Sequence, residues 1–370
     1  MLVIIAPDSF KGTATAPQAA AGLAAGVRAA APDATVLTLP MADGGEGTAR
    51  ALADAAATSG SHVETITLPV TDAIGRLTQA SYFIDRTTDT AYIDVAAASG
   101  LPAVADALDP LHADTYGTGV LIADAESRGV THIVLGLGGT ATMDGGTGIL
   151  TALGAACHDA RGYALPKGGA PLVQVHTIDT AQLNMKAALL DYTLLADTRV
   201  TPAQAPAVYG PQKGATPEQA ALLTGALLRL CEVTGISPDT EYFGAAGAIP
   251  VGLTWVSSLM WGTAEHVRVL PGARYVANAM HLAERLANAD LLITGEGALD
   301  SQSLTGKVVG ELAGLAHAAG IPLGITAGRI DAEAAAALPG TVLTTELEDG
   351  IAMQEQLRRA GAELIRAFRE

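Results

Sequence analysis

Five glycine-containing segments hold most of the side chains in this sequence that could do chemistry. Each combines glycines with carboxylates, hydroxyls or a lysine; they are residues 6–13 (APDSFKGT), 42–48 (ADGGEGT), 134–148 (VLGLGGTATMDGGTG), 209–217 (YGPQKGATP) and 294–307 (TGEGALDSQSLTGK). Glycine lets backbone amides approach a bound anion closely. Lysines add positive charge, and carboxylates can hold a metal ion or a substrate hydroxyl group. The combination predicts a site for a phosphate-bearing ligand.

The chain has five lysines, and most of them adjoin a glycine. Four of the five are next to a glycine, namely Lys11, Lys167, Lys213 and Lys307. A formal net charge of −17 repels phosphate, so a phosphate site in this chain needs positive charge supplied locally. Because the chain has 42 glycines, any single one of these pairs can equally be a coincidence.

The first two segments offer oxygen ligands. In residues 6–13, Asp8 can hold a metal ion or a substrate hydroxyl, Ser9 can donate to a substrate oxygen, and Lys11 can neutralise phosphate. In residues 42–48, Asp43 and Glu46 suit Mg²⁺ or a substrate that carries hydroxyl groups. A purely structural interpretation, in which these acids cap helices, stays open for both segments.

The third segment is the densest in glycine and is expected to bind phosphate through its backbone amides. The nucleotide-binding residues predicted here are Gly138, Gly139, Thr140, Asp144 and Gly145. The start of the segment also fits a dinucleotide-binding motif weakly, but no strand with an acidic residue follows about twenty positions later.

The last two segments supply further charges. Lys213 is expected to contact phosphate, as is Lys307 at the start of a helix, and Glu296 and Asp300 are the first choice for Mg²⁺. The segment that ends at Lys307 is not a P-loop, because Ser301 stands where the first glycine of that motif would be. The sequence also lacks the common zinc-protease and serine-hydrolase motifs.

The elements that must position these segments alternate between strands and helices. Strands are expected at residues 2–6, 35–39 and 63–68, with helices at 15–31 and 46–57, and the alternation resumes after residue 290. This pattern predicts a parallel-sheet α/β domain formed by residues 1–70 and 286–370, interrupted by a second domain at 71–285 that begins with a hairpin. Ligands of open parallel sheets bind where strands lead into helices, which is where we expect the five segments.

Composition narrows the class of protein. A length of 370 residues favours two domains, and 49% hydrophobic with 16% charged residues is typical of a globular chain. The negative charge argues against nucleic acid and anionic membranes as partners. No apolar stretch approaches the roughly 18 residues of a membrane span and no basic leader begins the chain, so we expect a cytoplasmic protein. Cys157 and Cys231 suggest neither a disulfide framework nor a zinc site.

Taken in order, the five segments resemble the signatures of the type 1 glycerate kinase family, whose members transfer phosphate from ATP to D-glycerate. The resemblance implies a flavodoxin-like (Rossmann-type) α/β domain, an inserted α/β domain with a mixed sheet, and an active site in the interdomain cleft. It further implies ATP as phosphoryl donor, a small hydroxy acid as substrate, and 2-phosphoglycerate as product. Mg²⁺ is expected as a cofactor because the few lysines of so acidic a chain cannot neutralise ATP and glycerate together. A homodimer is compatible with these expectations.

Within that hypothesis, Lys11, Lys213 and Lys307 contact phosphate, and one aspartate accepts the proton of the substrate hydroxyl. Asp197 is the first choice for this base, with Asp8 and Asp43 as alternatives.

Two places depart from the family pattern. Residues 196–202 read ADTRVTP where the family usually has D-V-x-N-P-L-x-G, so that Asp197 alone is retained, and Ala248 stands where a GAAGG-like run has its last glycine. Three alternatives follow. The chain could phosphorylate another small hydroxy acid, act as a nicotinamide-dependent reductase through residues 136–141, or serve as a non-catalytic sugar-acid or nucleotide sensor.

Overall fold

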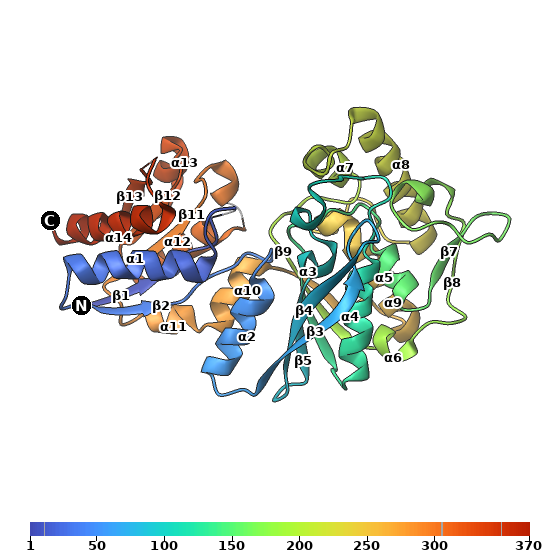
Figure 1. Ribbon diagram of the computed structural model, residues 1–370, viewed down its shortest axis with the longest axis horizontal. Coiled ribbons are helices and arrows are strands. Elements are labelled where there is room, and N and C mark those ends of the chain that lie inside the picture. The colour runs from blue at the N-terminus through green and yellow to red at the C-terminus, as the bar shows by residue number, and fades with distance from the viewer. Residues whose placement is uncertain (11, 305, 349) are drawn as a thin grey trace. The chain divides into compact units, whose positions relative to one another are not determined.

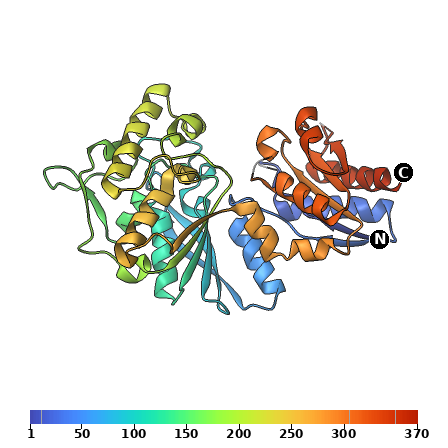
Figure 2. The same ribbon diagram turned by 180° about the vertical axis from the view of Figure 1, so that it is seen from behind.

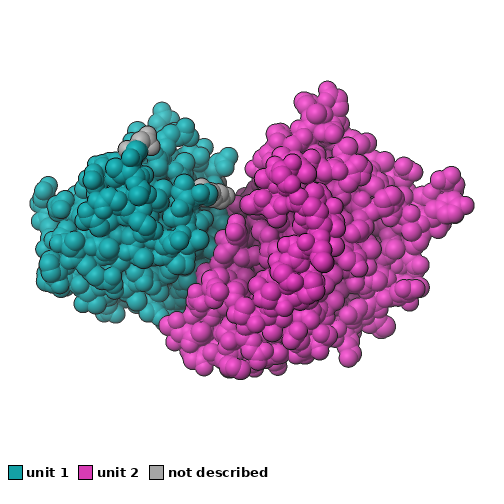
Figure 3. All heavy atoms as spheres, in the orientation of Figure 1, with its two compact units in different colours: residues 1–43, 271–370 teal, residues 44–270 magenta. Residues whose placement is uncertain are grey.

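The computed structural model describes residues 1–10, 12–304, 306–348 and 350–370 (Figure 1). The chain forms two compact units, which Figure 3 colours separately: unit 1 comprises residues 1–43 and 271–370, and unit 2 comprises residues 44–270. Both units combine helices with a β-sheet, and the predicted α/β fold class is confirmed.

Unit 1 contains a five-stranded sheet in which every pairing is parallel. Its strands are β1 (Leu2–Ile5), β2 (Thr35–Thr38), β11 (Leu291–Glu296), β12 (Leu323–Ala327) and β13 (Val342–Glu346). The spatial order β2-β1-β11-β12-β13 is the flavodoxin-like order 2-1-3-4-5 when the strands are counted along this unit. The direction of winding changes between β1 and β11, and such a switch point is where open α/β sheets bind ligands.

Helices cover both faces of this sheet. They are α1 (Ala16–Ala30), α10 (Gly272–Ala279), α11 (Leu282–Leu286), α12 (Val308–Ala319), α13 (Ala332–Ala337) and α14 (Met353–Arg369). The first and last helices, α1 and α14, lie side by side on one face (Figure 1), and α12 lies on the other (Figure 2). Thr15 and Gln18 form a capping box that starts α1. Gly26 and Gly361 let α1 and α14 touch, because a Cβ at either position would collide with the backbone of the other helix.

Unit 2 is built on a six-stranded mixed sheet in the order β10-β9-β6-β5-β4-β3. The strands are β3 (Val63–Thr71), β4 (Leu77–Asp85), β5 (Thr90–Asp94), β6 (His132–Gly136), β9 (Asp191–Ala196) and β10 (Val267–Pro271). Strands β3, β4 and β5 pair in antiparallel fashion, whereas β5, β6 and β9 are parallel. A small antiparallel pair joins β7 (Ala156–His158) to β8 (Thr177–Asp179).

The helices of unit 2 enclose a core of strand residues such as Tyr82, Ile133 and Leu194. They are α2 (Thr48–Thr58), α3 (Ala96–Ser99), α4 (Tyr116–Ser127), α5 (Thr147–Ala152), α6 (Met185–Ala188), α7 (Ala205–Tyr209), α8 (Pro217–Thr234) and α9 (Ala245–Trp261). Thr216 caps α8 and Pro217 is its first residue, as the sequence predicts. Segment 209–217 lies between α7 and α8 and does not follow a strand, which differs from the expectation for all five segments.

The predicted assignment of residues 44–70 to the first domain differs from the structure. Strand β3 pairs with β4 along its whole length, from Val63 opposite Asp85 to Thr71 opposite Leu77, and so belongs to the sheet of unit 2. The alternating sequence VETITLPVT suits a half-exposed antiparallel strand better than a buried parallel one. The unit boundaries consequently fall after residues 43 and 270, whereas the sequence suggested 70 and 285.

Among the described residues, no helix combines the length and the apolar character that crossing a membrane requires.

Candidate active site

The glycine-rich loop after β6 is mostly buried. In residues 134–148, all of which the structure describes, only Gly138 and Gly139 reach the surface, and Thr140 beside them is 4% exposed. The Leu137 amide donates to the Leu195 carbonyl of β9 (3.1 Å), which fixes the loop to the neighbouring strand. The part of this loop that a ligand can reach is therefore its tip at 138–139.

Asp144 holds the loop from inside. Its side chain is fully buried, and its Oδ2 accepts hydrogen bonds from the Thr115 amide (2.9 Å), the Thr115 hydroxyl (2.8 Å) and the Gly148 amide (3.0 Å). Its Oδ1 accepts from the Gly146 amide (3.1 Å). Burial raises the pKa of Asp144, and the nearby charge of Asp114 raises it further. Asp144, which the sequence suggested as a nucleotide contact, thus has no surface to offer a ligand and instead shapes the loop.

Lys213 lies beneath the tip of the loop. It is 3% exposed, and its Nζ donates to the Thr142 carbonyl (2.8 Å) and to the Thr140 hydroxyl (3.2 Å). Burial lowers the pKa of Lys213 to about 7, and the charge of Asp144 opposes that shift. The structure thereby brings two predicted phosphate contacts together, Lys213 and Thr140.

A strained turn supports the loop from the other side. Ala246, Gly247 and Ala248 have φ values of 53°, 67° and 70°, which form a left-handed turn at the start of α9. The Gly145 amide donates to the Gly247 carbonyl (2.9 Å), and a Cβ at Gly247 would collide with the Thr142 carbonyl. Alanine in this conformation costs roughly 1–2 kcal/mol per residue. Ala248 bears that strain where the family-like run would have a glycine.

Segment 44–48 packs directly against this region. The Gly138 amide donates to the Gly44 carbonyl (2.8 Å), and a Cβ at Gly138 would lie 2.6 Å from the Gly45 Cα. A Cβ at Gly44 would lie 2.7 Å from the Leu195 carbonyl oxygen, so glycine is required for this close approach. Asp197 follows the last residue of β9 at the same edge of the sheet. Unit 2 therefore gathers segment 44–48, the glycine loop and Asp197 at the carboxyl ends of β6 and β9.

Asp94, which the sequence reasoning missed, lies at the same edge. Its Oδ2 accepts from the Gly47 amide (2.8 Å) and its Oδ1 from the Ala49 amide (2.8 Å), at the start of α2. Asp94 ends β5 beside Gly136, the last residue of β6. Burial raises the pKa of Asp94 to about 7, with a smaller contribution from Glu46. The only sequence signal was an acid at the end of a strand.

In unit 1, predicted residues gather at the carboxyl edge of the parallel sheet. The Asp8 amide donates to the Gly295 carbonyl of β11 (2.9 Å), and the Ser9 amide donates to the Asp8 carboxylate (2.6 Å). The Met41 amide donates to the Pro7 carbonyl (2.9 Å), which ties the segment before Asp43 to the segment before Asp8. Residues after β1, β2 and β11 thus meet, as the parallel arrangement predicts.

Glu296 is the most constrained acid of this group. It ends β11, is 8% exposed, and its buried Oε1 has no hydrogen-bond partner among the residues that the structure describes. Burial raises the pKa of Glu296; a hydrogen bond with Ser303 and the charge of Lys307 oppose this, whereas Asp300 and Asp43 reinforce it. Lys307, Asp300 and Asp43 are therefore close enough to Glu296 to affect its pKa.

The acids of the described residues do not form a preformed metal cluster. Within residues 1–10, 12–304, 306–348 and 350–370, no three His, Cys, Asp or Glu side chains come together in a way that could hold a metal ion. Mg²⁺ commonly uses only one or two carboxylates and completes its shell with water and phosphate oxygens, so the pair Glu296 and Asp300 fits that chemistry. The orphaned Oε1 of Glu296 is the feature that favours it.

Lys11 and Lys167, two further lysines that adjoin a glycine, stand differently. Lys11 lies outside the described residues, so its role in phosphate binding stays a prediction. Lys167 pairs with the buried Asp114 (3.1 Å) and lies over the Tyr116 ring, 4.3 Å from its centre. Lys167 therefore takes part in an ion pair within unit 2.

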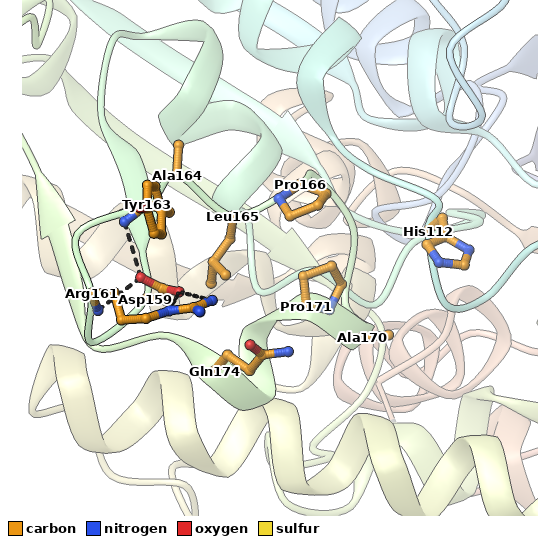
Figure 4. Close-up of a pocket in the computed structure, with 10 residues that line it drawn as sticks. All are labelled: His112, Asp159, Arg161, Tyr163, Ala164, Leu165, Pro166, Ala170, Pro171 and Gln174. Atoms are coloured by element: carbon orange, nitrogen blue, oxygen red, sulfur yellow. Dashed lines mark hydrogen bonds and ion pairs between the residues drawn. The ribbon is translucent and has the colours of Figure 1, made fainter.

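A separate cavity of about 500 Å³ opens elsewhere in unit 2 (Figure 4). Its lining comes from His112 and from residues between 159 and 174, where Arg161 pairs with Asp159 (3.1 Å). It does not coincide with the site residues suggested by the sequence, and Arg161 is already neutralised by its partner.

The fold and these loops define a two-unit α/β protein with glycine-containing loops at the carboxyl edges of its two main sheets, and comparison with known proteins identifies its family. The sequence matches the glycerate kinase family over residues 3–370. It is 38% identical to the glycerate kinase of Haemophilus influenzae, covering 83% of this chain and 80% of that protein. It is 37% identical to the glycerate 2-kinase of Escherichia coli, with coverage of 83% and 80%.

A solved structure agrees over the whole chain. A crystal structure assigned provisionally to glycerate kinase 2 of Salmonella typhimurium LT2 matches with a TM-score of 0.78 at 33% identity, covering 100% of this chain and 98% of that one. The chain belongs to the glycerate kinase family, whose named members are phosphotransferases that act on an alcohol group.

Proposed function

We propose that this chain transfers the terminal phosphoryl group of ATP to D-glycerate and forms 2-phosphoglycerate. Membership of the family supports the donor and the acceptor, and the relative named glycerate 2-kinase supports the position of transfer. The observation that carries the proposal is the convergence of segment 44–48, the tip at 138–139 and Lys213 at one sheet edge of unit 2. Phosphoryl transfer depends mainly on positioning and charge stabilisation, which glycine-rich loops and lysines provide.

In this proposal, the nucleotide phosphates bind at Gly138, Gly139 and Thr140, the surface part of the glycine loop. Lys213 lies directly behind this tip and contributes positive charge in a setting with little solvent, where electrostatic interactions are strengthened. Lys307 and Lys11 are also assigned to phosphate, and Lys11 lies outside the described residues. Gly145 and Asp144 keep the loop in shape rather than touching the nucleotide.

Glu296 and Asp300 are the proposed Mg²⁺ ligands. When bound, Mg²⁺ would neutralise phosphate charge that a chain of net charge −17 cannot offset with its few lysines. The buried Oε1 of Glu296, which has no hydrogen-bond partner among the described residues, is suited to a cation because a bound metal ion would satisfy it. Activity that persists undiminished in excess chelator would contradict this part of the proposal.

Glycerate is assigned to Ser9, Asp43 and Glu46, which offer a hydroxyl donor and two carboxylate acceptors. Asp197 is the proposed base for the attacking hydroxyl, with Asp8 and Asp43 as alternatives. General-base groups contribute roughly 10²–10⁴-fold to the rate. Asp197→Asn should therefore lower kcat by about 100-fold or more. A folded Asp197→Asn variant with near-full turnover would exclude this role and direct attention to Asp8 and Asp43.

The deciding experiment is an ADP-release assay with ATP, Mg²⁺ and a panel of hydroxy acids that includes both enantiomers of glycerate. We expect turnover to be highest with D-glycerate. Phosphorus NMR identifies the product, because phosphate on C2 couples to one proton and phosphate on C3 to two. Turnover with another hydroxy acid in preference to glycerate would reassign the substrate. Binding without turnover would indicate a sensor, and NADH oxidation would indicate a reductase.

A further inference from the structure

Asp94 is a half-buried carboxylate to which the proposed reaction gives no role. It caps α2 from a distance in sequence, since the amides of Gly47 and Ala49 are 47 and 45 residues before it. Gly47, the residue that precedes α2, has a φ of 93° and no side chain with which to cap the helix. A Cβ at Gly47 would meet no atom within 4 Å, so glycine is favoured here by its positive φ and not by a lack of room. The helix start therefore depends on Asp94 for its acceptors.

The same contact completes a set of anchors around segment 44–48. At its beginning, the Gly44 amide donates to the Thr48 hydroxyl (3.1 Å), and the Gly44 carbonyl accepts from the Gly138 amide (2.8 Å). At its end, Asp94 holds Gly47 and Ala49. Glu46, between these anchors, is exposed. A short segment fixed at both ends presents the residue between them in a defined direction.

From this geometry we infer that Asp94 is a positioning residue for the hydroxy-acid substrate: it fixes the backbone of segment 44–49 so that Glu46 is presented to the substrate. The inference rests on the proposed function, which assigns Glu46 to glycerate. Asp94 does not touch the substrate in this account, because both of its oxygens are engaged by amides. Its loss should weaken glycerate binding more than ATP binding.

The test compares Asp94→Asn with a matched control, Asp85→Asn. An asparagine keeps the shape but turns a donor toward one of the two amides, so one hydrogen bond is replaced by an opposed pair of donors. Asp85 belongs to the same sheet, is buried, and accepts a hydrogen bond from the Thr87 amide (2.8 Å), but it pairs with Thr90 at the other end of β5. We expect Asp94→Asn to raise the glycerate KM about tenfold, with the ATP KM changed less than about twofold, and Asp85→Asn to change neither.

Hydrogen exchange on the ligand-free protein tests the anchor without using activity. The amides of Gly47 and Ala49 should exchange faster in Asp94→Asn than in the parent and in Asp85→Asn. A second variant, Asp94→Glu, keeps two acceptor oxygens and should raise the glycerate KM and the exchange rates by less than Asp94→Asn. Unchanged exchange in both Asp94 variants, or equal rises in the glycerate and ATP KM, would overturn the inference. If the parent protein has no activity on glycerate, the proposed function fails, and the exchange data still report on the anchor.

Discussion

Replacing Lys213 with methionine separates the cost of burying a charge from the benefit of that charge to phosphate. Methionine has a similar length and no charge. Lys213 is 3% exposed, and its pKa is lowered from 10.5 to about 7. Since one pKa unit corresponds to about 1.4 kcal/mol, keeping this ammonium charged inside the fold costs on the order of 4 kcal/mol at neutral pH.

Lys213→Met also removes two hydrogen bonds, to the Thr142 carbonyl (2.8 Å) and the Thr140 hydroxyl (3.2 Å). If the two buried acceptors together lose about 1–3 kcal/mol when this donor is removed, subtracting that from the charge-burial cost leaves a net stabilisation of about 1–3 kcal/mol at pH 7. For a unit of this size, that raises Tm by about 2–12 °C. The kinase activity should fall at least about 100-fold in kcat/KM for ATP, because the charge behind the phosphate site is lost.

The pH dependence of this effect has a definite sign. The pKa of Lys213 is lower in the folded state than in the unfolded state, so between about pH 7 and 10.5 the unfolded state binds more protons. The free energy of unfolding of the parent therefore gains a contribution from Lys213 as the pH rises through this window. The methionine variant lacks that gain, and its advantage in Tm should shrink between pH 7 and 10.

Tryptophan fluorescence is a suitable probe, because both tryptophans of the chain, Trp255 and Trp261, lie in unit 2 with Lys213. Thermal unfolding would be followed at several pH values alongside the ADP-release assay. Lys186→Met is the control, since Lys186 is an exposed lysine of α6 in the same unit, and it should change neither Tm nor activity. A lower Tm for Lys213→Met at pH 7, or a Tm difference that does not shrink with pH, would refute the reasoning.

Three further predictions concern the other supports of the site. Glu296→Gln should raise the Mg²⁺ concentration for half-maximal activity at least about tenfold, because it removes a charged ligand; an unchanged Mg²⁺ titration would exclude Glu296 as a ligand. Asp144→Ala leaves buried donors of Thr115 unpaired and should lower the free energy of unfolding of unit 2 by about 3–5 kcal/mol. A urea titration followed by tryptophan fluorescence measures this loss. A loss below about 1 kcal/mol would contradict the bonding described. Ala248→Gly removes a Cβ from a φ of 70° and should stabilise unit 2 by up to about 1 kcal/mol, whereas Ala248→Val should destabilise it; the opposite order in Tm would argue against strain at this turn.

The sequence was sufficient for features that depend on local pattern. Thr216 with Pro217 predicts the start of α8. The alternation of strands and helices predicts the parallel sheet that brings the ends of β1 and β11 together. Predictions of this kind succeed because capping and periodicity involve neighbours along the chain.

Features that depend on distant partners were not predictable. Asp144 looked like a ligand residue in a glycine loop, but the amide and the hydroxyl of Thr115, 29 positions away, donate hydrogen bonds to it. Asp94 gave almost no signal, since its role depends on a helix start 45 residues earlier. Strand β3 carried the right alternation, but the sequence does not say which sheet a strand will join. In each case the deciding contact is made by tertiary structure.

The discontinuous sheet of unit 1 has a consequence for how the protein forms during synthesis. Val3 of β1 pairs beside Leu291 of β11, so the central strand pairing joins chain segments made far apart in time. Before β11 emerges from the ribosome, the described part of residues 1–43 contributes two strands to this sheet, β1 and β2, and two strands alone are marginally stable. Unit 2 is one continuous stretch of chain and can complete its own core first. Strand β1, although it is made well before unit 2, should thus be among the last elements to acquire its final partners.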